Sequence, residues 1–205
     1  MLNNSSPQTF IFIGRSGCGK GTQVELLEKW LKENNPERSI FKLETGALLR
    51  NFIKDDTNHS SRLASTIYNV GGLMPEFLTT WVWSCEFIEH FNDSQHIIID
   101  GTPRRLNEAK ILDSALKFYG RAKPVIILIN VSREWAEEKL KSRHRMDDSS
   151  SDVKRRLDWF ETDVAKAIEF YRNGEDFYYS VIEIDGEKAI EEVHKEIIGK
   201  LTSQS

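Results

Sequence analysis

A glycine-rich segment near the N-terminus has the composition and spacing of a phosphate-binding loop. Residues 14–22 read Gly-Arg-Ser-Gly-Cys-Gly-Lys-Gly-Thr, follow the apolar run Phe10–Ile13 and precede a segment with helical periodicity. Glycines let backbone N–H groups close around an anion, and the N-terminus of the next helix adds its positive dipole end. Lys20 supplies a mobile charge for the β- and γ-phosphates of a nucleotide. An ordinary strand-to-helix turn, which is the alternative, does not require Gly14, Gly19 and Lys20 at their motif positions.

A carboxylate and a set of arginines could complete a site for phosphoryl transfer. Asp100 ends the apolar run Ile97–Ile99 and precedes Gly101, a placement that suits Mg²⁺ held directly or through water beside a phosphate loop. Without that loop, an Asp-Gly pair would be an ordinary end of a strand. The arginines that fall beside predicted loops or helix starts are Arg50, Arg104, Arg143, Arg145 and Arg156. Each alone could be a solvated surface charge, but a converging set would stabilise a moving phosphoryl group.

The elements that must position these residues alternate between apolar runs and helical patterns. The apolar runs are residues 10–13, 40–43, 97–99, 125–129 and 181–184. Continuous apolar strands between helices predict an α/β fold with a parallel sheet covered on both faces. Residues 45–96 hold three further helical patterns, which predict a small helical subdomain over the carboxyl edge of the sheet, where ligands bind in such folds.

One helix is expected to follow the polar stretch 147–152, which has Ser and Asp residues suited to capping its N-terminus. Its apolar residues recur at helical spacing and are expected to share one buried face: Val153, Leu157, Phe160, Val164, Ile168 and Tyr171. Trp81 and Trp83 lie in an apolar helical pattern and are expected to be packing residues.

Composition limits the classes of protein to which the chain can belong. The 205 residues are 39% hydrophobic and 29% charged, which is typical of one globular domain. A net charge of −4 argues against general binding to nucleic acid or to anionic membranes. Cys18 and Cys85 cannot form a disulfide framework and lack metal-ligand spacing. No run is long enough to span a membrane and no secretory signal is evident, so we expect a cytoplasmic protein.

Five segments, in order along the chain, resemble motifs of the nucleoside monophosphate kinases of the adenylate kinase type. The resemblance covers about residues 9–200 and explains why Gly21, rather than Ser or Thr, follows Lys20. The matching segments are Gly19-Lys20-Gly21-Thr22-Gln23, Thr45-Gly46-Ala47-Leu48-Leu49-Arg50, Asp100-Gly101-Thr102-Pro103-Arg104, Arg145-Met146-Asp147-Asp148 with Arg156-Leu157, and Ile184-Asp185-Gly186-Glu187-Lys188.

The resemblance implies a fold and a division of the chain. The fold would be that of phosphate-loop nucleotide kinases, with five parallel strands in the order 2-3-1-4-5 and helices on both faces. Residues 1–205 would form one domain with a core, an insert for the nucleoside monophosphate and a lid. The core would comprise residues 9–44, 75–138 and 153–201, the insert residues 45–74, and the short lid residues 139–152. Such a lid has no set of cysteines, so no structural zinc is expected.

The resemblance also implies a role for each matched residue. The residues that would contact ATP are Gly17, Cys18, Gly19, Lys20, Gly21, Thr22, Lys139 and, through its backbone carbonyl, Lys188. The residues that would line the acceptor nucleotide are Thr45, Gly46, Arg50, Leu73, Met74, Gly101, Arg104 and Glu108. The residues that would act in catalysis are Lys20, Arg104, Arg143, Arg145 and Arg156. Asp100 would hold Mg²⁺ through water.

The implied activity is reversible phosphoryl transfer from MgATP to AMP by a monomer that binds small nucleotides. Four positions depart from the family pattern: Ala47 replaces Asp, Thr102 replaces Phe, Lys139 stands where an Arg would stack on the donor base, and Glu108 stands in place of a Gln. A kinase for a small hydroxylated metabolite would be expected to lack the acceptor motif that holds Thr45 and Arg50. A nucleotide-binding module without catalysis is a further alternative.

Glu108 leaves the acceptor base open, because it stands where adenylate kinases place a Gln. An ionised carboxylate only accepts hydrogen bonds, so it matches N1–H and the amino group of guanine better than the unprotonated N1 of adenine. Glu108 could instead hold a water, be protonated, or cap a helix that starts near Leu106. Thr45 favours the adenylate kinases, so AMP is the first expectation and GMP or another nucleotide the alternative.

Overall fold

Five parallel strands form the centre of the protein, as the sequence predicts. The structure is a computed structural model that describes residues 6–54, 58–143, 150–174 and 178–203, with the backbone alone at 143 and 150–152. The sheet has the order β2-β3-β1-β4-β5, which confirms the order implied by the resemblance. Its strands are β1 (Thr9–Gly14), β2 (Ile40–Glu44), β3 (His96–Asp100), β4 (Val125–Asn130) and β5 (Ser180–Asp185).

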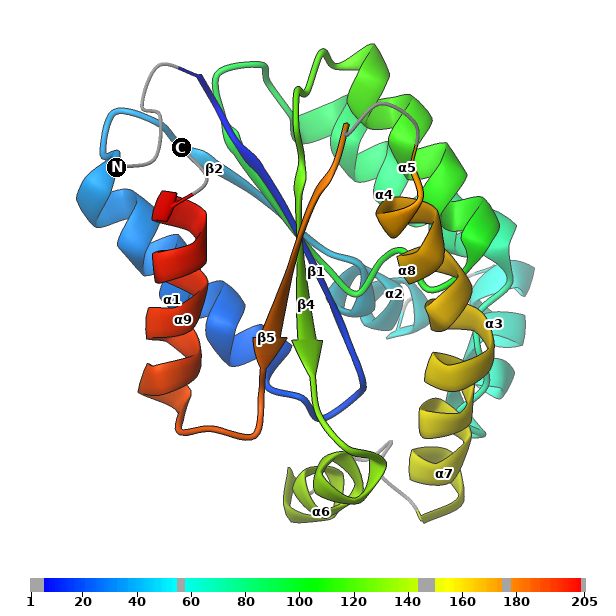
Figure 1. The fold of residues 1–205 in the computed structure, drawn as a ribbon. Coiled ribbons are helices and arrows are strands. Elements are labelled where there is room, and N and C mark those ends of the chain that lie inside the picture. The colour runs from blue at the N-terminus through cyan, green and yellow to red at the C-terminus, as the bar shows by residue number, and fades with distance from the viewer. Residues whose placement is uncertain (1–5, 55–57, 144–149, 175–177, 204–205) are drawn as a thin grey trace.

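Helices cover both faces of this sheet (Figure 1). On one side lie α1 (Lys20–Asn34) and α9 (Ile190–Ser203), and on the other α4 (Glu76–His90), α5 (Leu106–Phe118) and α8 (Ala165–Arg172). The strand β1 shows why both faces are needed. Phe10 and Phe12 pack into the core on the α1 and α9 side, whereas Ile11 and Ile13 pack into the core on the α4, α5 and α8 side. Burying each such side chain stabilises the fold by roughly 1.5–3 kcal/mol.

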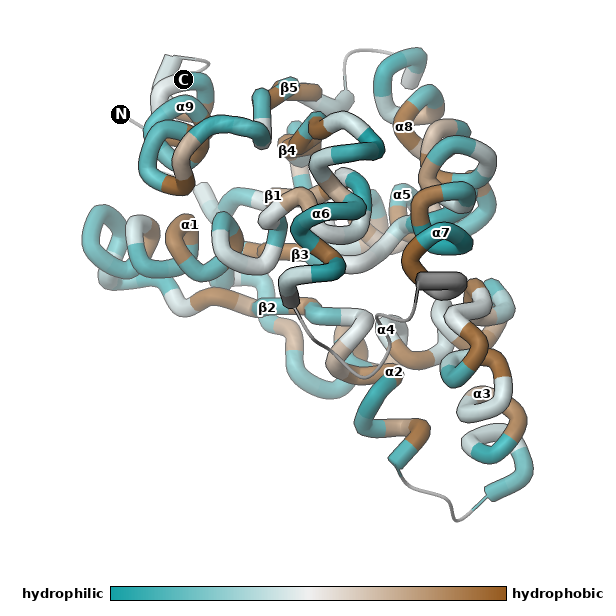
Figure 2. The backbone as a smooth tube through the Cα atoms, turned by 90° about the horizontal axis from the view of Figure 1, so that it is seen from below, coloured by the Kyte–Doolittle hydropathy of each residue, from teal (hydrophilic) through white to brown (hydrophobic). Residues whose placement is uncertain are grey.

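The remaining helices lie at the carboxyl edge of the sheet. The insert after β2 forms α2 (Thr45–Lys54) and α3 (His59–Asn69), and α6 (Arg133–Arg143) and α7 (Ser150–Trp159) follow β4. The view along this edge shows α2, α3, α6 and α7 arranged around it (Figure 2). Of the three helical patterns predicted to form a subdomain at this edge, two do so as α2 and α3, whereas the third is α4, whose Trp83 and Phe87 pack on a face of the sheet. None of the described helices has the length and apolarity to span a membrane.

The helix predicted after residue 152 forms, but it does not have one buried face. A π-helical turn, η1 (Phe160–Val164), separates α7 from α8. Val153 and Leu157 belong to the core on the α1 and α9 side, whereas Val164, Ile168 and Tyr171 belong to the core on the opposite face of the sheet. A π-helical turn is wider than an α-helical turn, so it rotates the following residues relative to those before it. Spacing alone could not show this change of partner.

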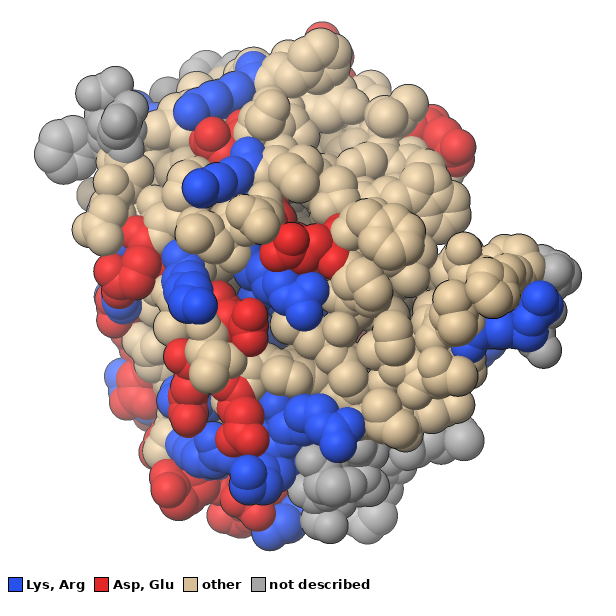
Figure 3. All heavy atoms as spheres, turned by 90° about the vertical axis from the view of Figure 1, so that its right-hand side faces the viewer, with Lys and Arg blue, Asp and Glu red and all other residues tan. Residues whose placement is uncertain are grey.

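The prediction that both tryptophans of α4 are packing residues is correct for Trp83 and only partly so for Trp81, whose ring packs edge-on against Phe52 of α2 with centroids 5.4 Å apart. Trp83 is 1% exposed and Trp81 is 51% exposed. Trp81 shares the outer face of α4 with Phe77 and Ile88, which are also exposed. Figure 3 faces this side of the molecule, and much of the surface just to the right of its centre carries no charged side chain.

A buried histidine at the amino edge of the sheet should make stability depend on pH. His96 Nδ1 accepts a hydrogen bond from the Gln8 N–H at 3.1 Å, and His96 Nε2 is buried with no partner among the described residues. Burial, with Arg38 and Arg121 nearby, lowers the pKa of His96 from 6.5 to about 4. The unfolded chain therefore binds more protons between these values, so stability should fall as pH drops from 6.5 to 4, by about 3 kcal/mol.

Urea unfolding at pH 4.5, 5.5 and 7 measures this effect. We expect His96→Gln to flatten the dependence of unfolding free energy on pH, whatever its effect at pH 7. His90→Gln, at the exposed end of α4, is the matched control and should keep the wild-type slope. A wild-type slope in His96→Gln would contradict the assignment.

Candidate active site

A cleft of about 630 Å³ opens between the phosphate loop, the helical insert and the end of β3. Its lining includes Lys20, Arg50, Asp100, Arg104 and Arg156, which are separated by up to 136 positions in the sequence. Parallel strands place their carboxyl ends at one edge of a sheet, and the β1, β2 and β3 ends all contribute here. The structure thus brings together three of the five arginines that the sequence singles out.

The residues between β1 and α1 adopt a conformation that depends on glycine. Gly17 and Gly19 have φ angles of 87° and 88°, which residues with a Cβ rarely adopt. A Cβ on Gly17 would also lie 2.9 Å from the carbonyl oxygen of Ala136 in α6. Helix α1 begins at Lys20, so the loop points its free N–H groups and the helix dipole toward the cleft.

Lys20 is held at the mouth of this loop by backbone oxygens. Its Nζ donates to the carbonyl oxygens of Gly14 at 2.7 Å and Arg15 at 2.9 Å, and it lies 3.4 Å from Cys18 Sγ. The Cys18 side chain is 3% exposed, so it packs inside the loop. Lys20 is therefore already close to the position in which it could bind phosphate.

Arg104 lies at the centre of the cleft's charges. Its Nε donates to the carbonyl oxygen of Gly101 at 3.0 Å. Burial lowers the pKa of its guanidinium, Glu108 and Asp100 raise it, and Arg156 and Arg50 lower it. The last two contributions show that three guanidinium groups are close enough to repel one another. Such a concentration of positive charge is suited to binding phosphate groups.

The acceptor side contains a buried hydroxyl with unused bonding capacity. Thr45 begins α2 and is 1% exposed, and its Oγ1 has no hydrogen-bond partner among the described residues. Gly46 and Met74 line the cleft, whereas Thr45 lies just behind its lining and Leu73 is not part of it. A buried unpaired hydroxyl costs free energy, so this atom is a candidate contact for a ligand.

Glu108 lies beneath the cleft rather than among its lining residues. It is 1% exposed, and its Oε2 accepts hydrogen bonds from the Arg104 N–H at 2.7 Å and the Thr102 Oγ1 at 3.4 Å. Burial raises the pKa of this carboxyl, while the bond from Arg104 and the charges of Arg104 and Arg105 lower it. Glu108 is the third residue of α5, so this bond joins Arg104, the residue before the N-cap Arg105, to the first turn of the helix, and a contact of Glu108 with a base stays a prediction.

Only some of the residues expected to contact ATP line the cleft in the described part of the chain. Lys139 lines the cleft with its Nζ 5.1 Å from the centre of the Trp135 ring. The Lys188 side chain is instead paired with Glu196 at 2.9 Å, so a role for its backbone carbonyl stays a prediction. The side chain of Arg143, the whole of Arg145 and most of the lid lie outside the described residues, as does any test of a zinc site there.

Sequence reasoning missed several residues that line the cleft. Trp159 could have been found, because it lies three positions after Arg156 and so shares its helix face. Glu44 could have been found as the last residue of β2, at the same sheet edge as Asp100. Tyr68 has no local signal, since only the folding of α3 toward the sheet brings it to the cleft.

The oxygen-bearing side chains of the cleft are suited to bind a Mg²⁺ ion that keeps several of its water ligands. The described part of the chain contains no group of three His, Cys, Asp or Glu side chains arranged to hold a metal. Asp100 and Thr22 do line the cleft beside Lys20. One carboxylate with a hydroxyl suits Mg²⁺, which keeps several waters and takes further ligands from phosphate oxygens.

Comparison with known proteins identifies the family. The family model described as adenylate kinase matches residues 12–176, which include the phosphate loop, the insert and Arg156. The chain belongs to the adenylate kinase family. The resemblance seen in the motifs is thereby confirmed.

Curated adenylate kinases are similar over almost their whole length. The adenylate kinase of Azobacteroides pseudotrichonymphae is 29% identical over 92% of this chain and 94% of that protein. That of Dehalococcoides mccartyi is 30% identical over 93% of this chain and 96% of that protein. Adenylate kinase 1 of a Nostoc species is 28% identical over 94% of this chain and 98% of that protein. Members of the adenylate kinase family generally use ATP and Mg²⁺, which agrees with the phosphate loop and with the presence of Asp100 and Thr22 in the cleft.

Proposed function

We propose that this protein is an adenylate kinase, which transfers the γ-phosphoryl group of MgATP to AMP and forms two molecules of ADP. The observation that carries the proposal is the convergence of Lys20, Asp100 and three arginines on one cleft. This set provides a phosphate loop for a donor and guanidinium groups for an acceptor phosphate. It lies at the sheet edge where nucleotides bind in such folds.

Positioning and charge neutralisation would account for the catalysis. Lys20 and the loop N–H groups from Gly17 to Thr22 would bind the donor β- and γ-phosphates. Arg50 and Arg104 would hold the acceptor α-phosphate so that its oxygen lies in line with the γ-phosphorus. Arg156, with Arg143 and Arg145 from the lid, would stabilise charge on the transferring group.

The acceptor phosphate oxygen is itself the nucleophile, so no general base is needed. When bound, Mg²⁺ supplies charge neutralisation between the β- and γ-phosphates, and Asp100 would hold it through water with Thr22 nearby. Lys139 and the Lys188 carbonyl would meet the adenine of ATP. Closure of the short lid would exclude water from the phosphates.

The acceptor side favours AMP. The Thr45 hydroxyl is buried without a partner in the described structure, and it lies where the resemblance places the acceptor base. Together with Gly46 and the backbone at Leu73 and Met74, it would line the base. GMP is the second candidate, favoured only by the presence of a carboxylate at Glu108, and that carboxylate is bonded to Arg104.

Acceptor specificity tests the proposal directly. The protein is incubated with MgATP and, separately, AMP, GMP, CMP, UMP or dTMP, and ADP formation is followed. We expect a strong preference for AMP. A preference for GMP would instead make Glu108 the specificity residue. If ATP binds without turnover of any acceptor, the protein is a nucleotide-binding module and not a kinase.

Replacing Glu108 separates its two possible roles. Gln keeps the side-chain shape and can still accept from the Arg104 N–H, but it carries no charge. If Glu108 only stabilises the start of α5, Glu108→Gln should leave the ratio of kcat/KM for AMP and GMP within about twofold of wild type. If the carboxylate instead recognises guanine through two hydrogen bonds, the substitution should lower kcat/KM for GMP by about tenfold or more, a loss worth roughly 1–3 kcal/mol. Asn107→Asp, at the exposed neighbouring position, is a control for charge at this helix end.

We further propose that the protein acts as a monomer on free nucleotides in the cytoplasm. Its net charge of −4 argues against a nucleic acid or an anionic membrane as partner. Light scattering of the purified protein tests the oligomeric state.

A further inference from the structure

Two carboxylates of the π-helical turn η1 pair with arginines that lie behind the cleft, in three different segments of the chain. Glu161 and Asp163 are separated by one residue, and both pair with arginines from other elements. A π-helical turn is wider than an α-helical one, and such turns occur often at functional sites. In this protein it directly follows α7, which carries Arg156.

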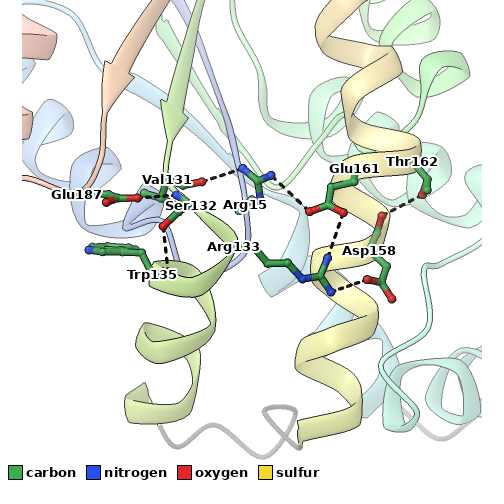
Figure 4. Close-up of polar contacts among 9 residues, drawn as sticks. All are labelled: Arg15, Val131, Ser132, Arg133, Trp135, Asp158, Glu161, Thr162 and Glu187. Carbon is green, nitrogen blue, oxygen red and sulfur yellow. Dashed lines mark hydrogen bonds and ion pairs between the residues drawn. The ribbon is translucent and has the colours of Figure 1, made fainter.

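Glu161 joins the phosphate loop to the helix that follows β4 (Figure 4). Its Oε1 lies 3.5 Å from Nη2 of Arg15, the second residue of the loop. Its Oε2 accepts from Nη1 of Arg133 at 3.1 Å, and Arg133 is the first residue of α6. The other Arg133 nitrogen donates to Asp158 at 2.6 Å, so α6 is bound to the last turn of α7 as well.

Arg15 is oriented by further contacts that direct it away from the cleft. Its Nη1 donates to the Val131 carbonyl oxygen at 2.8 Å, and its guanidinium carbon lies 4.6 Å from the centre of the Phe160 ring. It is absent from the residues that line the cleft. Arg15 is therefore a link between the loop and η1 rather than a further phosphate ligand.

Asp163 reaches toward the acceptor side. Its Oδ1 lies 3.9 Å from Nε of Arg105, and Arg105 Nη1 donates to the Met74 carbonyl oxygen at 2.9 Å. Met74 lines the cleft and belongs to the stretch that would contact the acceptor base. The chain of contacts from Asp163 thus ends at the acceptor subsite, whereas that from Glu161 ends at the phosphate loop and α6.

We propose that Glu161 and Asp163 are positioning residues, which hold the donor and acceptor subsites respectively in register with Arg156. The proposal rests on the proposed function for the identity of the two nucleotides. Glu161 holds the phosphate loop and α6, so it positions Lys20 and Lys139. Asp163 acts through Arg105 on the backbone at Met74.

The charged side chains in these links are 21–44% exposed, which makes their strength sensitive to salt. Glu161→Gln should therefore raise the KM for ATP and lower kcat, each by about three- to tenfold, and leave the KM for AMP within about twofold. Asp163→Asn should raise the KM for AMP by about two- to fivefold and leave that for ATP unchanged. Raising the salt concentration should bring wild type toward Glu161→Gln.

The matched control is Glu169→Gln, which removes a carboxylate from the same helical segment that pairs only with exposed groups of α8. It should leave both KM values at wild type. Equal changes in the two KM values, or a Glu161→Gln variant that behaves like Glu169→Gln, would overturn the proposal. Affinity for ATP measured by calorimetry gives a readout that needs no turnover, so a failure of the proposed kinase activity remains distinguishable from a failure of this proposal.

Discussion

Arg104→Ala should lower kcat/KM for AMP by about 10³-fold or more, the largest loss that we expect from a single side chain. Arg104 lies in the cleft with Arg50 and Arg156, whose charges disfavour the positive charge of Arg104. Two nucleotide phosphate chains would offset that repulsion, and the guanidinium groups would stabilise the charge spread over the transferring group in the transition state. The loss should therefore appear in kcat as well as in the KM for AMP.

Steady-state kinetics with AMP varied at saturating MgATP measures the change. Arg172→Ala, which removes a guanidinium paired with Glu169 and Glu183 on the surface, is the matched control and should retain full activity. Circular dichroism checks that the variant is folded. A folded Arg104→Ala enzyme with near wild-type kcat/KM would exclude Arg104 from the chemistry.

Lys20→Met should lower kcat by about 10²- to 10³-fold and leave the fold intact. The ammonium group is held by the carbonyl oxygens of Gly14 and Arg15, so it is organised before the nucleotide arrives and loses little freedom on binding. Methionine has a similar shape but cannot donate a hydrogen bond or carry charge. The loss should be larger in kcat than in the affinity for ATP, because negative charge develops on the leaving oxygen of the β-phosphate during transfer.

Single-turnover kinetics and calorimetry with ATP separate the two quantities. Lys32→Met, on the same helix, removes an exposed lysine paired with Glu28 and should leave both unchanged. A loss of ATP affinity with unchanged kcat for Lys20→Met would mean that the lysine binds substrate and transition state equally well. Wild-type values for both would show that the loop does not hold the donor phosphates.

The features that the sequence predicted best are those with a short-range physical cause. An apolar run buried on both faces can only be a strand inside a covered sheet, and the predicted strands agree with β1–β5 to within one residue at each end. The phosphate loop is equally local, because positive φ angles at Gly17 and Gly19 require glycine at those positions. The order of the motifs that contain Thr45, Asp100 and Arg104 indicated the adenylate kinase family, and the family model confirms it.

The features that the sequence could not predict depend on contacts between distant residues. Nothing in the spacing of Arg50, Arg104 and Arg156 states that they converge, since convergence is produced by the packing of α2, β3 and α7 around one sheet edge. The position of Glu108 along the chain left its role open between a base contact and a helix cap. In the folded chain Glu108 is buried and accepts a hydrogen bond from the Arg104 N–H, a contact that spacing alone did not indicate.

The sequence by itself therefore determined the strands and the phosphate loop, because glycine conformation and the burial of apolar runs depend on local sequence. The strand order and the family came from the resemblance of motifs that follow one another along the chain. Only the tertiary structure decided which charges meet and which faces are buried. The π-helical turn shows this most clearly, because it sends Val153 and Val164 to cores on opposite faces of the sheet and points Glu161 at Arg15, 146 positions earlier. Such pairings depend on the summed geometry of many elements, which residue spacing along one helix does not contain.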